Sequence, residues 1–91
     1  MSKNAAPTSW EAYARELGAN LFRCRTEAGL TQEDLAHRAG MTRTHYQQIE
    51  RGSWRAGTPA NASVKALVRL AQQLDVPPGR LLPDPTQLEW P

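Results

Sequence analysis

Cysteine is almost absent from this chain of 91 residues, in which Cys24 is the only one. A single cysteine cannot build a disulfide framework, so a hydrophobic core must hold the fold, and a reducing cytoplasm fits the composition. No apolar run is long enough for a signal peptide or a membrane span. These absences predict a cytoplasmic protein.

Catalytic and metal-binding patterns are missing as well. The sequence contains no nucleophile with a nearby base, no cluster of metal ligands and no glycine-rich phosphate loop. His37 and His45 have no second ligand at a suitable spacing, and Cys24 falls on an apolar helical stripe that favours a small buried hydrophobe. We therefore expect no enzymatic activity, no metal and no cofactor.

The composition that is present suits one small globular domain, with 40% hydrophobic and 22% charged residues. The net charge is only +2, and the whole excess lies between residues 21 and 55. That segment contains six arginines and four acids, namely Arg23, Arg25, Arg38, Arg43, Arg51 and Arg55 against Glu27, Glu33, Asp34 and Glu50. A local positive excess favours attraction to phosphate groups.

Two short helices joined by a turn are predicted by the stretch that begins at Thr31. Thr31 suits the N-cap of the first helix, and Asp34, three residues later, suits the partner position of a capping box. Gly40 can take the left-handed backbone conformation at which this helix ends. Thr42 suits the N-cap of a second helix that runs to about Arg51.

The second of these helices has two distinct faces. Tyr46 and Ile49 lie three residues apart and form the face that turns to the core. The remaining face carries polar side chains related by i, i+4 spacing: Arg43, Thr44, Gln47, Gln48 and Arg51. Glu50 at its margin is the only acid there, whereas an ordinary solvated helix carries Glu and Lys. Arg, Thr and Gln side chains match the hydrogen-bonding edges of DNA bases.

A longer helix is expected before this pair. It begins at Thr8 or Ser9, where Glu11 suits a capping box, and it runs to about Glu27. Its predicted apolar stripe contains Trp10, Tyr13 or Ala14, Leu17, Leu21, Cys24 and Ala28.

Two more helices are expected after the pair. The loop 52–62 precedes a fourth helix capped by Asn61. Trp54 is expected to pack beneath this loop, and the alternative is that it covers a sugar of the nucleic acid. A fifth, short helix follows Pro77-Pro78 and carries residues 80–82. The expected boundaries are a flexible arm at 1–7, one domain at 8–83 that contains the motif 31–51, and a tail at 84–91.

These motifs resemble the helix-turn-helix domain of phage repressor and Cro proteins, the XRE family of bacterial regulators. The matching motifs are Leu-Gly-x-x-Leu (17–21), Arg-x-x-x-Gly-Leu-Thr-Gln-x-x-Leu-Ala (25–36), Gly40, Thr42, Ile-Glu-Arg-Gly (49–52) and Leu-x-x-Leu-Ala-x-x-Leu-x-Val (67–76). The resemblance implies an all-α, compact five-helix lambda-repressor-like fold in which helices 2 and 3 form the helix-turn-helix. It also implies a sequence-specific transcriptional regulator. The loop 52–62 departs from the family because it is several residues longer.

The resemblance further implies how the protein meets double-stranded DNA. The recognition helix 42–51 lies in the major groove, while the helix before it crosses the sugar-phosphate backbone. Expected base contacts come from Arg43, Thr44, Gln47 and Gln48, and expected backbone contacts from Gln32, Thr42, Arg51, Ser53 and Arg55. A phosphate contact suits Gln47 equally well. Arg25 and Glu50 match a pair that forms a partly buried salt bridge in relatives.

The sequence is compatible with two kinds of protein partner. A single domain of this size contacts few bases, so the resemblance implies a homodimer on a pseudo-palindromic operator. Its dimer surface is expected at the fifth helix and the tail, where Leu81, Leu82, Leu88 and Trp90 offer apolar area, unless Leu88 and Trp90 fold back onto their own core. The alternative function is an antitoxin, which binds DNA and a partner toxin. Co-purification of a toxin would favour that alternative.

Overall fold

Helix α1 (Trp10–Glu27) is the longest element in a computed structural model that describes residues 6–90. Ser9 is its N-cap, and the Ser9 hydroxyl accepts the backbone N–H of Ala12 at 3.1 Å. The start and the end of this helix agree with the prediction. The predicted capping box is wrong, because a cap at Ser9 gives the third helical position to Ala12 and leaves Glu11 one residue short of it.

Helix α2 (Gln32–Arg38) begins with the predicted capping box. The Thr31 hydroxyl accepts the Asp34 N–H at 3.0 Å, and the Asp34 carboxylate accepts the Thr31 N–H at 3.2 Å. Two N–H groups that the first turn leaves unpaired are thereby satisfied. Gly40 follows with φ of +72°, a conformation that favours glycine and turns the chain toward the next helix.

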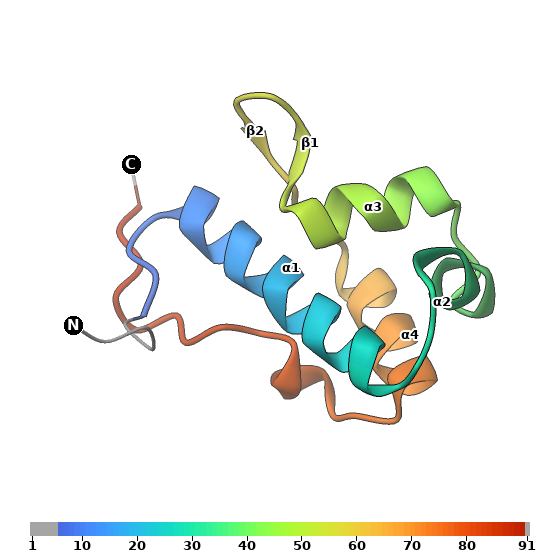
Figure 1. The fold of residues 1–91 in the computed structure, drawn as a ribbon. Helices are drawn as coiled ribbons and strands as arrows, with labels where there is room; N and C mark the ends of the chain where they lie inside the picture. The colour runs from blue at the N-terminus through green and yellow to red at the C-terminus, as the bar shows by residue number, and fades with distance from the viewer. Residues whose placement is uncertain (1–5, 91) are drawn as a thin grey trace.

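Helix α3 (Arg43–Arg51) is capped by the Thr42 hydroxyl and ends at Gly52, whose φ is +86°. Tyr46 and Ile49 are buried, as the spacing predicts. Figure 1 shows α3 lying across the upper side of the molecule, with α1 and α4 beneath it and α2 beside its N-terminal end.

A β-hairpin occupies the segment predicted to be a loop. Strands β1 (Ser53–Arg55) and β2 (Thr58–Pro59) pair in antiparallel fashion, and helix α4 (Val64–Leu74) follows. The N-cap of α4 is Ser63, whose hydroxyl accepts a backbone N–H of the first turn at 3.0 Å. The prediction of Asn61 as the cap is therefore wrong, and the helix begins two residues later than that cap requires.

The expected fifth helix is also wrong. The segment Pro78–Arg80 forms a single 3-10 turn, η1, so residues 6–90 contain four α-helices and a small hairpin rather than five helices. Pro77 and Pro78 have no N–H to donate, and Pro83 ends the segment, so too few residues remain between the prolines for an α-helix. The fold is therefore mostly helical and lambda-repressor-like.

The segment after η1 returns along α1. The Tyr13 hydroxyl donates to the carbonyl of Pro83 at 3.0 Å, and the backbone N–H of Glu89 donates to the carbonyl of Thr8 at 2.9 Å. Trp90 stacks on Trp10 with a ring-centre separation of 6.1 Å. Figure 1 shows this segment running back beside α1, so that the C-terminal end lies near the start of that helix. Most of the arm predicted at residues 1–7 lies outside the described residues.

The core lies where α1, α2, α3 and α4 meet. Its fully buried large side chains are Leu21, Leu35, Tyr46, Ile49, Leu70 and Leu81. Cys24 is buried among them, whereas Ala28 at the end of the predicted apolar stripe is exposed. No helix within residues 6–90 has the length and apolar character needed to cross a membrane.

Candidate DNA-binding surface

The outer face of α3 carries the polar side chains that the sequence predicts there. Arg43, Thr44 and Arg51 are exposed, and Gln47 and Gln48 are half-buried. Within the described residues the Arg43 guanidinium has no hydrogen-bonding partner, so its donors point to solvent at the start of the helix. The exposed Thr42 uses its hydroxyl oxygen as the helix cap.

Glu50 at the other end of α3 is the centre of a hydrogen-bonded network. Its carboxylate accepts from Arg25 Nε at 2.8 Å, from the Tyr46 hydroxyl at 2.7 Å and from Gln32 Nε2 at 2.6 Å. The side chains of Arg25 and Glu50 are only 12% and 9% exposed. Burial raises the pKa of Glu50, but the hydrogen bonds from these three donors outweigh burial and hold that pKa below its ordinary value. The network joins α1, α2 and α3.

Gln32 makes a second bond to α3, which the sequence analysis did not predict. Its Oε1 accepts from Gln47 Nε2 at 3.1 Å, while its Nε2 donates to Glu50. A carboxamide nitrogen has two hydrogens, so one N–H of Gln32 remains for a phosphate oxygen. Gln32 and Arg43 also line the same open recess at the start of α2. The predicted phosphate contact and the predicted guanine contact are therefore neighbours.

Gln48 and Arg51 form hydrogen bonds with the first strand of the hairpin. Gln48 Nε2 donates to the carbonyl of Trp54 at 3.2 Å, and the Arg51 guanidinium donates to that carbonyl at 3.2 Å and to both the hydroxyl and the carbonyl of Ser53. Trp54 is half-buried against the core, as predicted, and its ring lies 5.7 Å from that of His45. One side of α3 thus supports the first strand of the hairpin.

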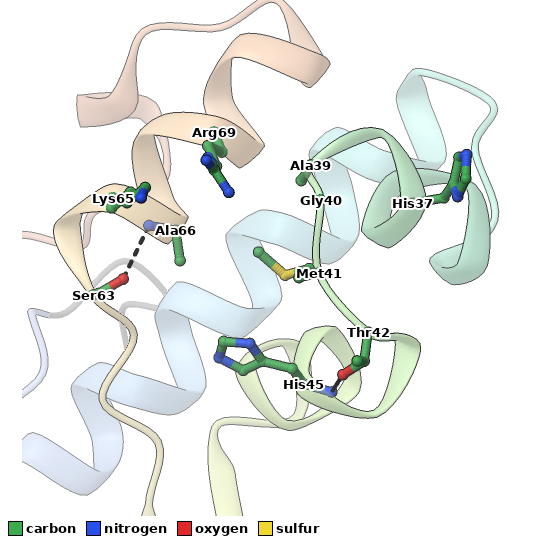
Figure 2. Close-up of a pocket in the computed structure, with 10 residues that line it drawn as sticks. All are labelled: His37, Ala39, Gly40, Met41, Thr42, His45, Ser63, Lys65, Ala66 and Arg69. Carbon is green, nitrogen blue, oxygen red and sulfur yellow. Dashed lines mark hydrogen bonds between the residues drawn. The ribbon is translucent and has the colours of Figure 1, made fainter.

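A basic groove beside the start of α3 is a second feature that the sequence analysis missed. It has a volume of about 670 Å³ and is lined by basic side chains from three helices, with no acidic residue among its described lining: His37, His45, Lys65 and Arg69. Figure 2 shows Lys65 and Arg69 on α4 facing His45 across the groove. The charge count of residues 21–55 could not reveal it, because Lys65 and Arg69 lie outside that segment and only the fold brings them beside α3.

Two short helices joined by a tight turn, with a polar outer face on the second and basic groups around it, define a helix-turn-helix DNA-binding protein. Residues 21–81 match the model of the helix-turn-helix family. The chain belongs to this XRE family, and it is a transcriptional regulator of the helix-turn-helix type. Membership of the family places it among regulators rather than enzymes.

Relatives of the chain are regulators as well. Over 60 residues, which are 66% of this chain and 70% of the relative, it is 38% identical to the uncharacterized HTH-type transcriptional regulator y4dJ of Sinorhizobium fredii. The restriction-modification controller protein C.AhdI from Aeromonas hydrophila has a similar structure, with a TM-score of 0.67 and 35% identity over 76% of this chain and 96% of that one. The hypothetical transcription factor NHTF from Neisseria has a TM-score of 0.68 and 27% identity over 86% and 82% of the two chains.

Proposed function

We propose that this regulator binds a specific double-stranded operator, with α3 in the major groove and the start of α2 against the sugar-phosphate backbone. The network on Glu50 carries this proposal, because it holds Gln32 in place on α2 while Arg43 and Thr44 stay exposed about two turns before Glu50 on α3. A surface held in its binding geometry loses little conformational entropy on association. Regulation then follows from occupancy of the operator, in the cytoplasm at the nucleoid.

The side chains divide into base contacts and backbone contacts. Arg43 suits a bidentate contact to guanine, and Thr44 suits a thymine methyl group. Gln47 and Gln48 complete the base-contacting set, through the N–H and C=O groups that their bonds to Gln32 and to the Trp54 carbonyl leave over. The proposed backbone contacts are Gln32, Thr42, Arg51, Ser53 and Arg55.

Selection of bound duplexes from a random pool tests the function as a whole. We expect a single enriched motif that appears twice with opposite orientation. Binding is measured in buffer of low salt concentration, because contacts to phosphate are strongest there and any DNA-binding protein binds most readily. The absence of binding in that buffer, or binding without an enriched motif, overturns the proposal.

Separate substitutions of Arg43 and Gln32 test which side chain contacts a base and which contacts the sugar-phosphate backbone. Arg43→Ala should lose preference at one base pair, by roughly fivefold or more, because a bidentate contact contributes about 1–3 kcal/mol of discrimination. Gln32→Ala should weaken binding to every sequence alike. The measurement is fluorescence anisotropy with duplexes that vary one position at a time. Equal loss for all sequences with Arg43→Ala contradicts the assignment.

The proposed regulator is a homodimer on two half-sites about one helical turn apart. The dimer surface expected from the sequence is only partly available, since Leu81 is fully buried and Leu88 packs against the core. Leu82 and Trp90 remain 44% and 69% exposed. Buried Leu81 is a correction to the expected surface, and its cause is the η1 turn, which directs Leu81 inward.

Sedimentation tests the dimer directly. We expect a dimer at tens of micromolar protein, and Leu82→Glu should shift it toward the monomer because a charge then lies in an apolar contact. Glu11→Gln, a change at an exposed residue of α1, is the control and should sediment as the unmodified protein does. A monomeric unmodified protein at that concentration, or a dimer that Leu82→Glu leaves intact, contradicts this part of the proposal.

A further inference from the structure

The hairpin is the part of the chain that the helix-turn-helix motif does not account for. Strand β1 ends at Arg55, which pairs with Thr58 across the tip. Between them lie Ala56 and Gly57, and Gly57 has φ of +79°, which suits glycine in a tight turn. All four residues except Thr58 are exposed. The tip is therefore slender, and Arg55 is its one long side chain.

Side chains of α3 fix the direction of this hairpin. Gln48 and Arg51 both donate to the Trp54 carbonyl, and the base is closed by a hydrogen bond of 2.9 Å from the Ala60 N–H to the Gly52 carbonyl. The tip therefore keeps one orientation relative to the recognition helix, unlike the end of an unsupported loop.

The hairpin points to the same side as the outer face of α3. Figure 1 shows it standing clear of the helices at the C-terminal end of α3, on the side away from α4. Tyr46 and Ile49 face the core, so the exposed side chains of α3 also point away from α4. A duplex that lies on α3 must therefore pass beside the hairpin.

We infer that the hairpin is a wing that inserts Arg55 into the minor groove next to the major-groove segment contacted by α3. The minor groove is about 6 Å wide, so only a slender element with small residues at its tip enters it. Arginine is favoured where A·T-rich sequence narrows this groove and deepens its negative potential. The inference rests on the proposed major-groove binding, and it replaces the backbone contact proposed above for Arg55 with a specificity determinant outside the major groove.

Variation of the base pairs that flank one operator tests whether the wing enters the minor groove. The selected operator is made with A·T, G·C or inosine·C pairs beyond the bases read by α3. Inosine·C resembles G·C in the major groove and A·T in the minor groove, because the 2-amino group is missing. We expect the full chain to bind the A·T and inosine·C flanks about fivefold more tightly than the G·C flank, since the groove-blocking amino group is present only in the last.

Arg55→Ala should bind all three flanks equally. Arg80→Ala removes the same charge from exposed η1 and should keep the order of the unmodified protein. Three results contradict the wing. In the first, the unmodified protein binds the inosine·C flank with the affinity of the G·C flank, and in the second it binds all flanks with equal affinity. The third is that Arg55→Ala lowers the affinity for all flanks by one factor and preserves their order. In each of these cases tight operator binding still stands, so failure of the wing is distinct from failure of the proposed function.

Discussion

Gly18→Ala is expected to lower the free energy of unfolding by about 3 kcal/mol or more, which places it among the most damaging single changes in the chain. A Cβ at residue 18 would lie 2.1 Å from the carbonyl oxygen of Glu50 and 2.9 Å from that of Ile49. Both atoms belong to the backbone of α3, so no side-chain rotation relieves the overlap. Helices α1 and α3 would have to separate, and the core between them would open.

The expected loss of stability is opposite in sign to the usual effect of a glycine-to-alanine change in a helix, which makes the experiment informative. In an unobstructed helix, alanine in place of glycine stabilises by roughly 0.5–1 kcal/mol. Thermal unfolding followed by circular dichroism should instead show a melting temperature lower by roughly 12–24 °C, from about 4–8 °C per kcal/mol for a domain of this size. Gly79→Ala is the matched control, because a Cβ at residue 79 meets no described atom within 4 Å. An unchanged melting temperature for Gly18→Ala contradicts the close approach of α1 and α3.

Local signals made most of the helix-turn-helix predictable. Thr31, Gly40 and Thr42 act through neighbours within four residues, so their effects on the backbone can be inferred from spacing alone. The burial of Tyr46 and Ile49 follows from helical periodicity in the same way. Where structure depends on adjacent residues, the chain contains enough information to locate it.

The errors lie where distant residues decide the structure. The hairpin has only two paired strands, and it is held by Gln48 and Arg51 of α3 rather than by a strong turn sequence of its own. Asn61 and Ser63 are both good capping residues, and the packing of α4 selects the second. Leu81 enters the core because η1 turns the chain, an outcome that its position after two prolines does not reveal.

Prediction of the DNA-binding surface from the sequence has the same limit. The Arg25 and Glu50 pair could be expected from the family resemblance, and the structure contains it. The bond between Gln47 and Gln32, by contrast, depends on side-chain conformation across two helices. Spacing places both amides near the outer face, but it does not decide whether they meet each other or solvent.

Glu50→Ala is expected to be the second large effect, with a loss of about 3–5 kcal/mol in the free energy of unfolding. The substitution leaves the partly buried Arg25 guanidinium, the Tyr46 hydroxyl and the Gln32 amide without their shared acceptor. Arg25→Ala should cost less, about 2–3 kcal/mol, because Glu50 then keeps two of its three donors. Denaturant unfolding of both variants and of the double mutant measures the coupling between the two residues.

The control for this series is Glu33→Ala, which removes an exposed acid from α2 and should change stability by less than about 0.5 kcal/mol. DNA affinity should fall together with stability in Glu50→Ala, since Gln32 loses the bond that orients it toward a phosphate. A full-strength complex formed by a destabilised Glu50→Ala variant contradicts the orienting role of the network and leaves it a purely structural one.

Acid titration distinguishes the network from simple packing. The pKa of Glu50 is lower in the folded protein than its ordinary value of 4.5. A depressed carboxyl pKa contributes stability that is complete above the ordinary value and is lost as the pH falls through the folded-state value. The stability difference between the unmodified protein and Glu50→Ala should therefore be constant from neutral pH down to about 5 and shrink at lower pH. A difference that stays constant into strong acid means that Glu50 stabilises the fold through its packing and not through its charge.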